Sequence, residues 1–350
     1  MMTKCNALFI SALVLFSFGC DDDDNPKPVS QANPSIYVLN EGPFSAGSGS
    51  ISQIDLSTNT VFKDVFFSRN GFPAGAILND FEIIGNQYYI VSNLSAKVEV
   101  ASVFDWTSTA TVSGFSSPRA VADLGNNRIG VSDWGTNKMY ILSSTGNTII
   151  DSVSTGSGPE KMVVLNDNIL IMNTGGFGLD STLTVINRSD LSLKQNLTVG
   201  DVPNSARITP SSLWVLCSGF SDWMDPSKDT PGRLLELNPN TLEILRNVEI
   251  PLSIGHPADL IYNANNASLY FLSNTYGGSI YSCPIANPSN FQKVKAGGYY
   301  SLDWDPIRSN IIAGNPLSFA ESGWVIRLSA NNTLIDSIEV GLIPTDYIFR

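Results

Sequence analysis

Residues 159–187 read PEKMVVLNDNILIMNTGGFGLDSTLTVIN, and this stretch contains the pattern that repeats through the chain. A proline opens a short apolar strand, a turn follows, and a second apolar strand ends at Asn173. A loop then leads to a third strand that ends at Asn187. Short apolar runs separated by turn residues are typical of β-strands. The stretch therefore predicts neighbouring strands of one antiparallel sheet.

The same pattern recurs along the chain. It begins at Pro73, Pro118, Pro159, Pro203 and Pro257, and residues 299–302 take the same place without a proline. The spacings run from 41 to 54 residues, which suits a four-stranded propeller blade. Second strands recur seven times and end at polar residues, namely Asn40, Asn93, Asp133, Asn173, Ser218, Asn274 and Asn315. No segment has a sustained helical period, so the sequence predicts an all-β, seven-bladed β-propeller over residues 35–350.

The two ends of this region complement each other. The first unit, from Ile36 onward, lacks a strand led by proline, and residues 344–350 (PTDYIFR) supply one. Propellers close their ring by pairing the last strand inside the first blade, which leaves no open sheet edge. We expect the C-terminal strand to pair with the N-terminal blade.

The N-terminus predicts export and a lipid anchor. Residues 1–19 have one lysine and an apolar core that is too short to span a bilayer, as in a signal peptide. Ser17-Phe18-Gly19-Cys20 resembles a bacterial lipobox, so we expect lipidation of Cys20. Residues 20–34 read as a disordered acidic tether, and the run Asp21–Asp24 resembles a signal for the outer face of the outer membrane. The alternative is ordinary secretion with Cys20 as a free thiol.

Composition excludes several functions. The formal net charge is −12, which is unsuited to binding nucleic acid through its phosphates. The single histidine, His256, cannot anchor a site of several imidazoles. We expect no catalytic residue, no metal, no cofactor and no enzyme activity. Cys217 and Cys283 read as buried thiols, although a bridge between them remains open.

One face of the predicted ring carries the irregular connections. The turn between second and third strands and the connection into each innermost strand share that face, and they include residues 41–49, 174–181, 219–232 and 316–323. Long, varied loops on a rigid scaffold are typical of binding surfaces. There we expect aromatic side chains to give contact area and polar groups to fix orientation. The candidate rim residues are Asn40, Phe44, Phe72, Asn93, Arg119, Asp133, Trp134, Asn173, Phe177, Phe220, Trp223, His256, Asn274, Tyr276, Tyr299, Asn315 and Phe319.

Each of these residues has a simpler interpretation. The aromatic side chains could pack between blades, and the repeated asparagines could cap turns. Some hydrolytic propellers hold a central calcium, and acidic residues do fall near the first strands: Asp80, Asp123, Asp259, Asp303 and Asp346. They do not recur at one register of the predicted repeat, which disfavours a calcium site.

The opening Tyr37-Val38-Leu39-Asn40-Glu41-Gly42, followed by Gly49-Ser50-Ile51-Ser52-Gln53-Ile54-Asp55, resembles the first blade of the YncE-like surface propellers and of their BtuG-type branch. That resemblance implies a lipoprotein that binds cobalamin on one propeller face. It also implies transfer of the ligand to an outer-membrane TonB-dependent transporter.

The leading hypothesis is a cell-surface protein that captures a scarce nutrient, with cobalamin or another corrinoid as the best candidate. Its expected partners are the ligand, that transporter and, through the lipid alone, the outer membrane. Two alternatives stay open: a propeller that holds protein partners at the cell surface, and a calcium-dependent hydrolase or lactonase.

Overall fold

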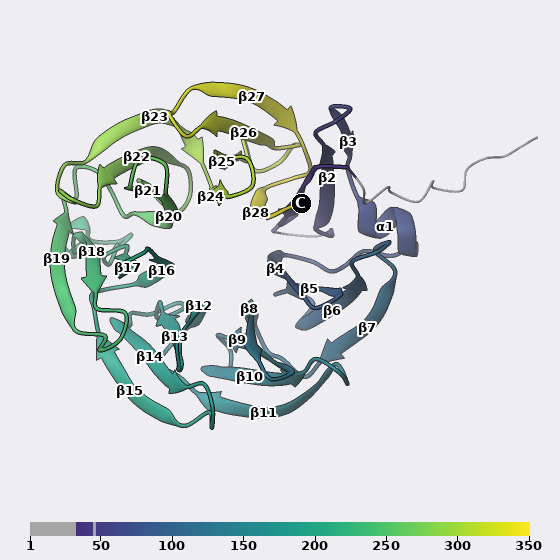
Figure 1. The fold of residues 1–350 in the computed structure, drawn as a ribbon, viewed down its shortest axis with the longest axis horizontal. Helices are drawn as coiled ribbons and strands as arrows, with labels where there is room; N and C mark the ends of the chain where they lie inside the picture. Colours follow the sequence, from purple (N-terminus) through teal and green to yellow (C-terminus); the bar gives the residue numbers. More distant parts are fainter. Residues whose placement is uncertain (1–32, 45–46) are drawn as a thin grey trace, which may run out of the picture.

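The computed structural model describes residues 33–44 and 47–350, which form a ring of seven four-stranded antiparallel sheets around a central channel (Figure 1). Blade 1 has the strand order β28-β1-β2-β3. Blades 2 to 7 each use four consecutive strands, from β4–β7 in blade 2 to β24–β27 in blade 7. The predicted seven-bladed propeller is confirmed. The expected signal peptide, Cys20 and the tether up to residue 32 lie outside the described residues.

The strands occupy four concentric positions. The innermost strands are β28 (Pro344–Phe349), β4 (Leu78–Ile84), β8 (Pro118–Gly125), β12 (Pro159–Leu165), β16 (Pro203–Ile208), β20 (Ala258–Asn263) and β24 (Ser301–Asp305). The second strands are β1 (Ser35–Asn40), β5 (Gln87–Ser92), β9 (Arg128–Asp133), β13 (Asn168–Asn173), β17 (Leu213–Cys217), β21 (Ser268–Leu272) and β25 (Asn310–Asn315). The third strands are β2 (Ser50–Asp55), β6 (Lys97–Ser102), β10 (Lys138–Ser143), β14 (Thr182–Asn187), β18 (Gly232–Leu237), β22 (Gly278–Pro284) and β26 (Trp324–Ser329). The outermost strands are β3 (Thr60–Phe62), β7 (Ser108–Ser113), β11 (Thr148–Ser154), β15 (Leu193–Thr198), β19 (Ile244–Ile250), β23 (Gln292–Tyr299) and β27 (Leu334–Glu339).

Burial follows these positions. Every residue of the second strands β1, β13, β17 and β21 is buried, because both faces of such a strand pack against neighbouring blades. The outermost strand β15 is almost wholly exposed. This gradient explains why the second strands, as continuous apolar runs, were the clearest signal in the sequence.

The core is divided among the blade junctions. Seven hydrophobic clusters are found in the described residues, and each joins two adjacent blades. At the junction of blades 1 and 2, Tyr88 and Trp106 stack with centroids 3.8 Å apart, and Tyr37 lies 5.2 Å from Trp106. Each Å² of apolar surface buried at a junction stabilises the fold by about 25 cal/mol. Because every blade buries its apolar surface against its neighbours, the stability of each blade depends on both of them.

The two cysteines lie in different clusters. Cys217 packs between blades 4 and 5, whereas Cys283 packs between blades 5 and 6. Both are free buried thiols, so the disulfide that the sequence left open does not form. Burial raises the pKa of both thiols, to about 12 for Cys283, which leaves them unreactive.

Ring closure follows the prediction. Strand β28 pairs with β1 from Phe349 opposite Ile36 to Pro344 opposite Asn40. The amide of Ser35 donates to the carbonyl of Arg350 at 2.8 Å, and the reverse bond is 2.9 Å. Both ends of the described chain therefore sit in one sheet (Figure 1).

The approach to blade 2 differs from the expectation. A six-residue helix, α1 (Val65–Asn70), is capped by Asp64, which accepts the amide of Phe67 at 3.0 Å, and it ends at Gly71 with φ of 74°. The strand expected from Pro73 begins only at Leu78, because Ile77 has a φ of 52°, which breaks an extended strand. Apart from α1 and the short 3₁₀ turn η1 (Pro226–Lys228), the described chain is strands and loops. None of its helices could span a bilayer.

Removing residues 344–350 tests the closure. The deletion exposes the inner edge of β1 and empties the place of Tyr347 between blades 7 and 1. We expect the free energy of unfolding to fall by more than about 4 kcal/mol and the transition to broaden, as measured by thermal and denaturant unfolding. Ile335→Ala, at an exposed site of the outermost strand β27, is the control and should cost less than about 1 kcal/mol. A truncated chain that melts like the intact protein would contradict the closure.

Candidate functional site

Two kinds of connection meet at one face of the ring. The residue after a second strand donates its N–H to the carbonyl of the residue before the innermost strand of the same blade. Such bonds run from Glu41 to Ile343 (2.8 Å), from Asn93 to Ile77 (2.9 Å), from Trp134 to Ser117 (2.9 Å), from Thr174 to Gly158 (2.9 Å) and from Ser218 to Val202 (2.9 Å). We call this side the loop face and the opposite side, which carries the shorter turns, the turn face.

A cationic and aromatic group lies at the mouth of the channel on the loop face. Arg119 places its guanidinium 4.2 Å from the ring centre of Trp134, and its Nε donates to both oxygens of Glu160 at 3.1 and 3.2 Å. Phe177 meets Trp134 edge-on at 5.8 Å and is fully exposed. The indole N–H of Trp134 is buried and has no acceptor among the described residues. A cation–π contact at a site of this kind contributes about 1 kcal/mol and fixes both planes.

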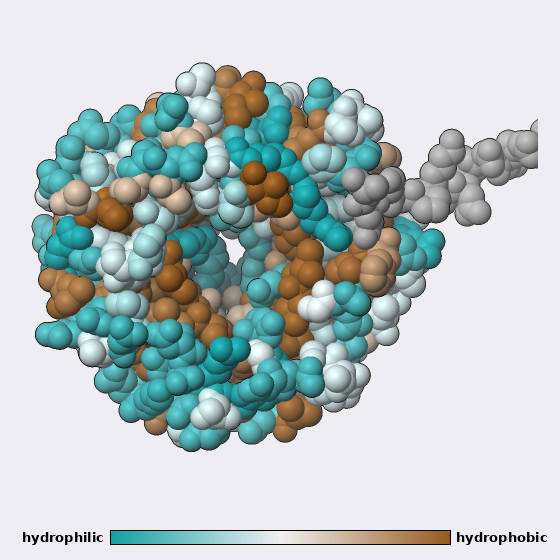
Figure 2. Space-filling view, viewed as in Figure 1, coloured by the Kyte–Doolittle hydropathy of each residue, from teal (hydrophilic) through white to brown (hydrophobic). Residues whose placement is uncertain are grey.

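A second aromatic group comes from blades 6, 7 and 1. Tyr300 meets Phe319 edge-on at 5.4 Å and lies 6.5 Å from Tyr276, while Phe319 lies 6.5 Å from Phe44. The hydroxyl of Tyr300 donates to Glu41 at 2.8 Å. The space-filling view shows the opening at the centre of the ring, with hydrophobic surface along parts of its edge (Figure 2).

The two groups face the same opening. Burial raises the pKa of the Glu41 carboxyl, while the Tyr300 hydroxyl and the charge of Arg119 act in the opposite direction. Burial and Glu41 also raise the pKa of Tyr300, which keeps its hydroxyl a donor. Aromatic surface, a cation and carboxylates thus converge on one mouth from five blades, which suits a large ligand with both apolar and amide or hydroxyl groups.

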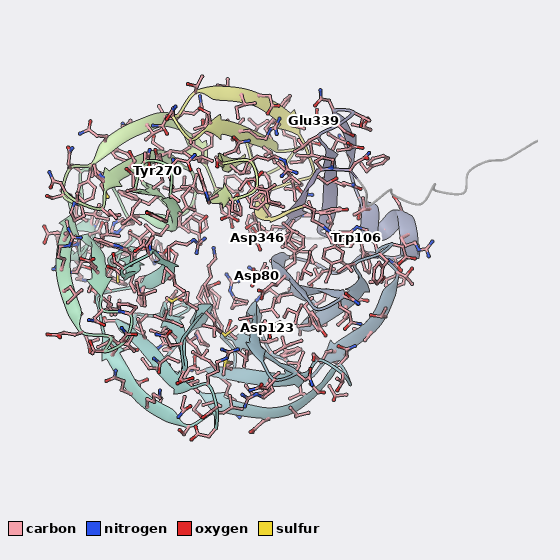
Figure 3. All side chains as sticks on the ribbon, viewed as in Figure 1. Asp80, Trp106, Asp123, Tyr270, Glu339 and Asp346 are labelled. Carbon is pink, nitrogen blue, oxygen red and sulfur yellow. The ribbon has the colours of Figure 1, made fainter. Side chains whose placement is uncertain are left out.

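Below the mouth, acidic side chains connect the innermost strands of neighbouring blades by hydrogen bonds. Asp346 accepts the amide of Phe81 at 3.3 Å, and Asp80 accepts that of Val121 at 2.7 Å. Asp259 accepts the amide of Leu302 at 3.2 Å. Each carboxylate binds the next blade, and Asp80 and Asp346 lie near the centre of the ring (Figure 3). Asp80, Asp259 and Asp346 therefore occupy the same position of the repeat, although the sequence suggested that the acidic residues share no register. At that position each carboxylate links its blade to the next.

Two ion pairs cross the channel. Lys161 of blade 4 lies 3.1 Å from Asp259 of blade 6, and Arg207 of blade 5 lies 3.8 Å from Asp303 of blade 7. A cavity of about 310 Å³ remains, with Asp80, Lys161 and Asp346 in its wall. The Lys161 side chain is still 41% exposed, so the channel is accessible to solvent at this point. These side chains form a polar floor beneath the mouth.

The channel carboxyls hold protons tightly. Burial raises the pKa of Glu82 to about 7 and that of Asp303 to about 6. Burial and the facing Asp80 carboxyl raise the pKa of Asp346 well above its usual value. Desolvation disfavours the charged form, and clustering of like charges adds to it.

The channel acids do not assemble a metal site. In residues 33–44 and 47–350, no three histidine, cysteine or acidic side chains are grouped as metal ligands. The oxygens of Asp80, Asp259 and Asp346 instead accept backbone amides. The described residues therefore provide no set of ligands for the calcium site that was one alternative from the sequence.

His256 organises the long loop between β17 and β18 on the loop face. Its Nδ1 lies 3.2 Å from the carbonyl of Ser218 and its Nε2 lies 3.3 Å from Asp229. Asp229 also accepts the amide of Asp222 at 2.7 Å. The loop between β17 and β18 is thereby held in shape, and it presents Trp223, which is 89% exposed.

Several predicted polar rim residues maintain the fold. Asn40 and Asn173 are buried, and their amides bond to hydroxyls of the adjacent third strand. Asp133 accepts the amides of Ser116 and Ser117 at 2.7 and 3.0 Å, and Asn93 donates to the carbonyl of Pro118 at 3.2 Å. The amide oxygens of Asn40 and Asn173 remain without a donor among the described residues.

The other predicted residues divide between loop and core. Asn274 and Asn315 cap their own turns by accepting the amides of Tyr276 and Leu317. Phe72 packs edge-on against the buried Phe66 near α1, and Phe220 is half-buried in the β17–β18 loop. Tyr299 packs in the core between blades 6 and 7.

Two residues of the mouth were not among the candidates. Glu41 and Glu160 each stand one position from a residue that marks the repeat in the sequence, Asn40 and Pro159. Arg119, Glu160 and Asn204 all directly follow the proline of an innermost strand, and this shared position was the signal that could have found Glu160.

Comparisons with known proteins give a family and a fold. A family model described as "Domain of unknown function (DUF5074)" matches residues 35–338. No curated protein matches the chain.

Solved structures resemble it at low identity. A quinonprotein alcohol dehydrogenase-like protein from Bacteroides thetaiotaomicron has a TM-score of 0.69 at 11% identity, covering 91% of this chain and 78% of its own. A protein from Bacteroides fragilis, named as a candidate 6-phosphogluconolactonase, has a TM-score of 0.65 at 9% identity, covering 91% and 99%. A functionally unknown protein from Desulfotomaculum acetoxidans has a TM-score of 0.63 at 14% identity, with the same coverage. These similarities establish the fold alone.

Glu82 makes stability depend on pH. Its folded-state pKa of about 7 lies above the ordinary value of 4.5, so the folded chain binds this proton more tightly than the unfolded chain. That stabilisation is complete below the ordinary pKa and is lost as the pH rises through 7. Glu82→Gln should therefore be more stable than the native protein at about pH 8, by about 3 kcal/mol, and should match it in acid.

Denaturant unfolding at both pH values measures the difference. The same change at Glu339, whose pKa is lowered by Lys63, is the control and should not stabilise the protein at about pH 8. Equal stability of Glu82→Gln and the native protein at the higher pH would show that Glu82 titrates normally.

Proposed function

The chain belongs to the DUF5074 family, a domain of unknown function, and from that premise we propose that it captures a large small-molecule ligand at the loop face. The observation that carries the proposal is the convergence of two aromatic groups on Arg119, Glu160 and Glu41 at the channel mouth. The polar floor of Lys161 and Asp259 holds the ligand at the mouth and keeps it from passing through.

A corrinoid is the best single candidate. It has a broad, partly apolar ring with amide arms, and the mouth offers aromatic planes together with a guanidinium and carboxylates. Aromatic side chains supply contact area at low entropic cost, and the charged groups orient amides. The resemblance of the first blade to the BtuG-type propellers supports this choice, with cobalamin or a related corrinoid as cargo.

We also propose a membrane anchor and a receiving partner. The protein is lipidated at Cys20, faces the cell exterior from the outer membrane, and passes its ligand to a TonB-dependent transporter. Exposed apolar side chains on the loop face, including Trp223 and Met224, support contact with a second protein. The same exposure supports the alternative of a protein-binding scaffold without a small ligand. The hydrolase alternative gains no comparable support.

Calorimetric titration with cobalamin, cobinamide and an unrelated siderophore tests the capture proposal. We expect heat from a corrinoid and none from the siderophore. Trp223→Ala and Tyr276→Ala should each weaken binding by about tenfold while changing the melting temperature by less than about 2 °C, since both side chains are largely exposed.

Ile150→Ala, an exposed residue of the outermost strand β11, is the control and should bind normally. Absence of heat with both corrinoids would reject the corrinoid proposal. A large fall in melting temperature for the Trp223 or Tyr276 variant would mark those residues as packing residues.

The anchor is tested at Cys20. Cys20→Ala should move the protein from the membrane fraction to the soluble fraction with unchanged unfolding, because lipid attachment needs the thiol and the propeller does not. Fractionation followed by immunodetection measures the change. A Cys20→Ala protein that remains in the outer membrane would contradict lipidation at this residue.

A further inference from the structure

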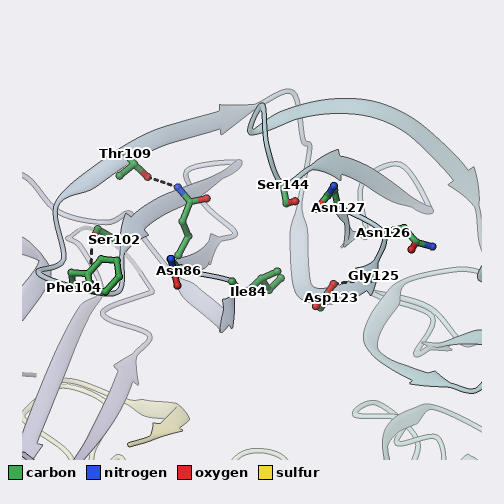
Figure 4. A pocket seen from close by; sticks show the side chains of 12 residues that line it. Ile84, Asn86, Ser102, Phe104, Thr109, Asp123, Gly125, Asn126, Asn127 and Ser144 are labelled. Carbon is green, nitrogen blue, oxygen red and sulfur yellow. Dashed lines mark hydrogen bonds between the residues drawn. The ribbon is translucent and has the colours of Figure 1, made fainter. Parts of the chain in front are cut away.

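A groove opens on the turn face between blades 2 and 3. Its cavity measures about 630 Å³, about twice that of the channel cavity. One wall comes from the turn Gly85–Asn86 and from Phe104, and the other comes from Asp123, the turn at residues 125–127 and Ser144 (Figure 4). A volume of this size lies within the range of small-molecule sites.

Left-handed turns display amides at this groove. Gly125, Asn126 and Asn127 have φ values of 72°, 54° and 59°. Asparagine tolerates this conformation better than other residues with a Cβ. Both asparagine side chains are exposed, and the hydrogen bonds found among the described residues include none made by either side chain. The turn therefore presents two free amides to the groove.

Apart from Ile84 and Phe104, the side chains of the lining are polar, and some are fixed in place. Gln87 donates to the hydroxyl of Thr109 at 3.0 Å, and its carbonyl oxygen lies 2.9 Å from the hydroxyl of Tyr89. Asp123 uses one carboxylate oxygen to accept the amide of Gly125 at 2.7 Å. The groove thus offers amides, hydroxyls and a carboxylate, and none of the described residues that line it is a lysine, an arginine or a histidine.

One aromatic ring stands open beside these polar groups. Phe104 lies in the turn between β6 and β7 and is 66% exposed. The amide of Phe104 is held by the hydroxyl of Ser102 at 3.1 Å, and the amide of Val103 is held by the carbonyl of Asn86 at 3.1 Å. The backbone under the ring is therefore anchored, and the ring offers a flat apolar surface at the groove.

Adjacent junctions on this face are filled instead. Between blades 3 and 4, Arg188 donates to the carbonyl of Leu124 at 2.6 Å and Arg128 donates to that of Ser189 at 3.2 Å. Between blades 1 and 2, Arg350 donates to the carbonyl of Val103 at 3.3 Å. At the junction of blades 2 and 3, no arginine makes such a bond among the described residues. The hydroxyl of Tyr89 donates to Asn147 there instead, and the groove lies open beside this junction.

We propose that this groove binds a neutral saccharide, at a site separate from the loop face. A pyranose has an apolar C–H face, which packs on an aromatic ring such as that of Phe104. Its equatorial hydroxyls pair with amides and carboxylates, which combine donors and acceptors as Asn126, Asn127 and Asp123 do. The guanidinium of Arg188 lies against Gly125 but donates to the carbonyl of Leu124, and the described lining residues themselves include no cation to pair with an anionic ligand such as a phosphate.

Saturation-transfer NMR with maltotriose, cellotriose, mannotriose and chitotriose tests the proposal on the intact propeller. At least one trisaccharide should bind, and Phe104→Ala should weaken its binding about tenfold. Asn126→Gly combined with Asn127→Gly should weaken binding about fivefold, because glycine keeps the left-handed backbone and removes only the amides.

Two controls separate this groove from other effects. Asn59→Gly makes the same change at a left-handed turn position of blade 1, where φ is 56°, and should bind saccharide normally. Phe177→Ala, on the loop face, should also leave saccharide binding unchanged. The proposal fails if none of the four trisaccharides shows saturation transfer, or if one binds equally well to the native protein and to Phe104→Ala. Neither failure bears on corrinoid binding at the loop face.

Discussion

The pairing of β28 with β1 is the constraint on which the rest of the structure depends. Five residue pairs, from Ile36 with Phe349 to Asn40 with Pro344, join the two ends of the described chain in one sheet. Each blade buries its apolar faces only against its neighbours, so a ring with an unpaired first blade would leave two junctions exposed. Closure converts seven marginal sheets into one cooperative core.

Closure also determines where polar groups can act. Once seven innermost strands surround a channel, their backbone amides face acidic side chains of the preceding blade, as Asp80 faces the amide of Val121. Those carboxylates are then engaged in holding blades together. Lys161 and Arg207 compensate part of their charge across the channel. The ion pairs make the channel a polar floor, and the ligand binding that we propose is at its mouth and in the open groove of the turn face.

Much of the fold was predictable from the sequence, and the site was predictable only in part. Continuous apolar second strands and proline-led first strands recur in register, so blade number and closure could be counted. Asn40 and Asn173 look like candidate ligand residues in sequence, but each is turned into the blade to bond with the next strand. Tyr299 and Tyr300 are adjacent, yet Tyr299 ends the outermost strand β23 and packs in the core, whereas Tyr300 lies in the connection to blade 7 and bonds to Glu41 at the mouth.

By itself, the sequence determined the propeller, its seven blades and its closing strand, because hydrophobic periodicity and turn residues are local properties of the chain. Only the tertiary structure decided which residues share the channel mouth, why the acidic residues of the inner strands link blades, and where a groove opens between Phe104 and Asn126. Those outcomes depend on side chains from strands far apart in the chain meeting across a junction. A local sequence pattern does not show which side chains of other blades will contact a given residue once the ring has closed.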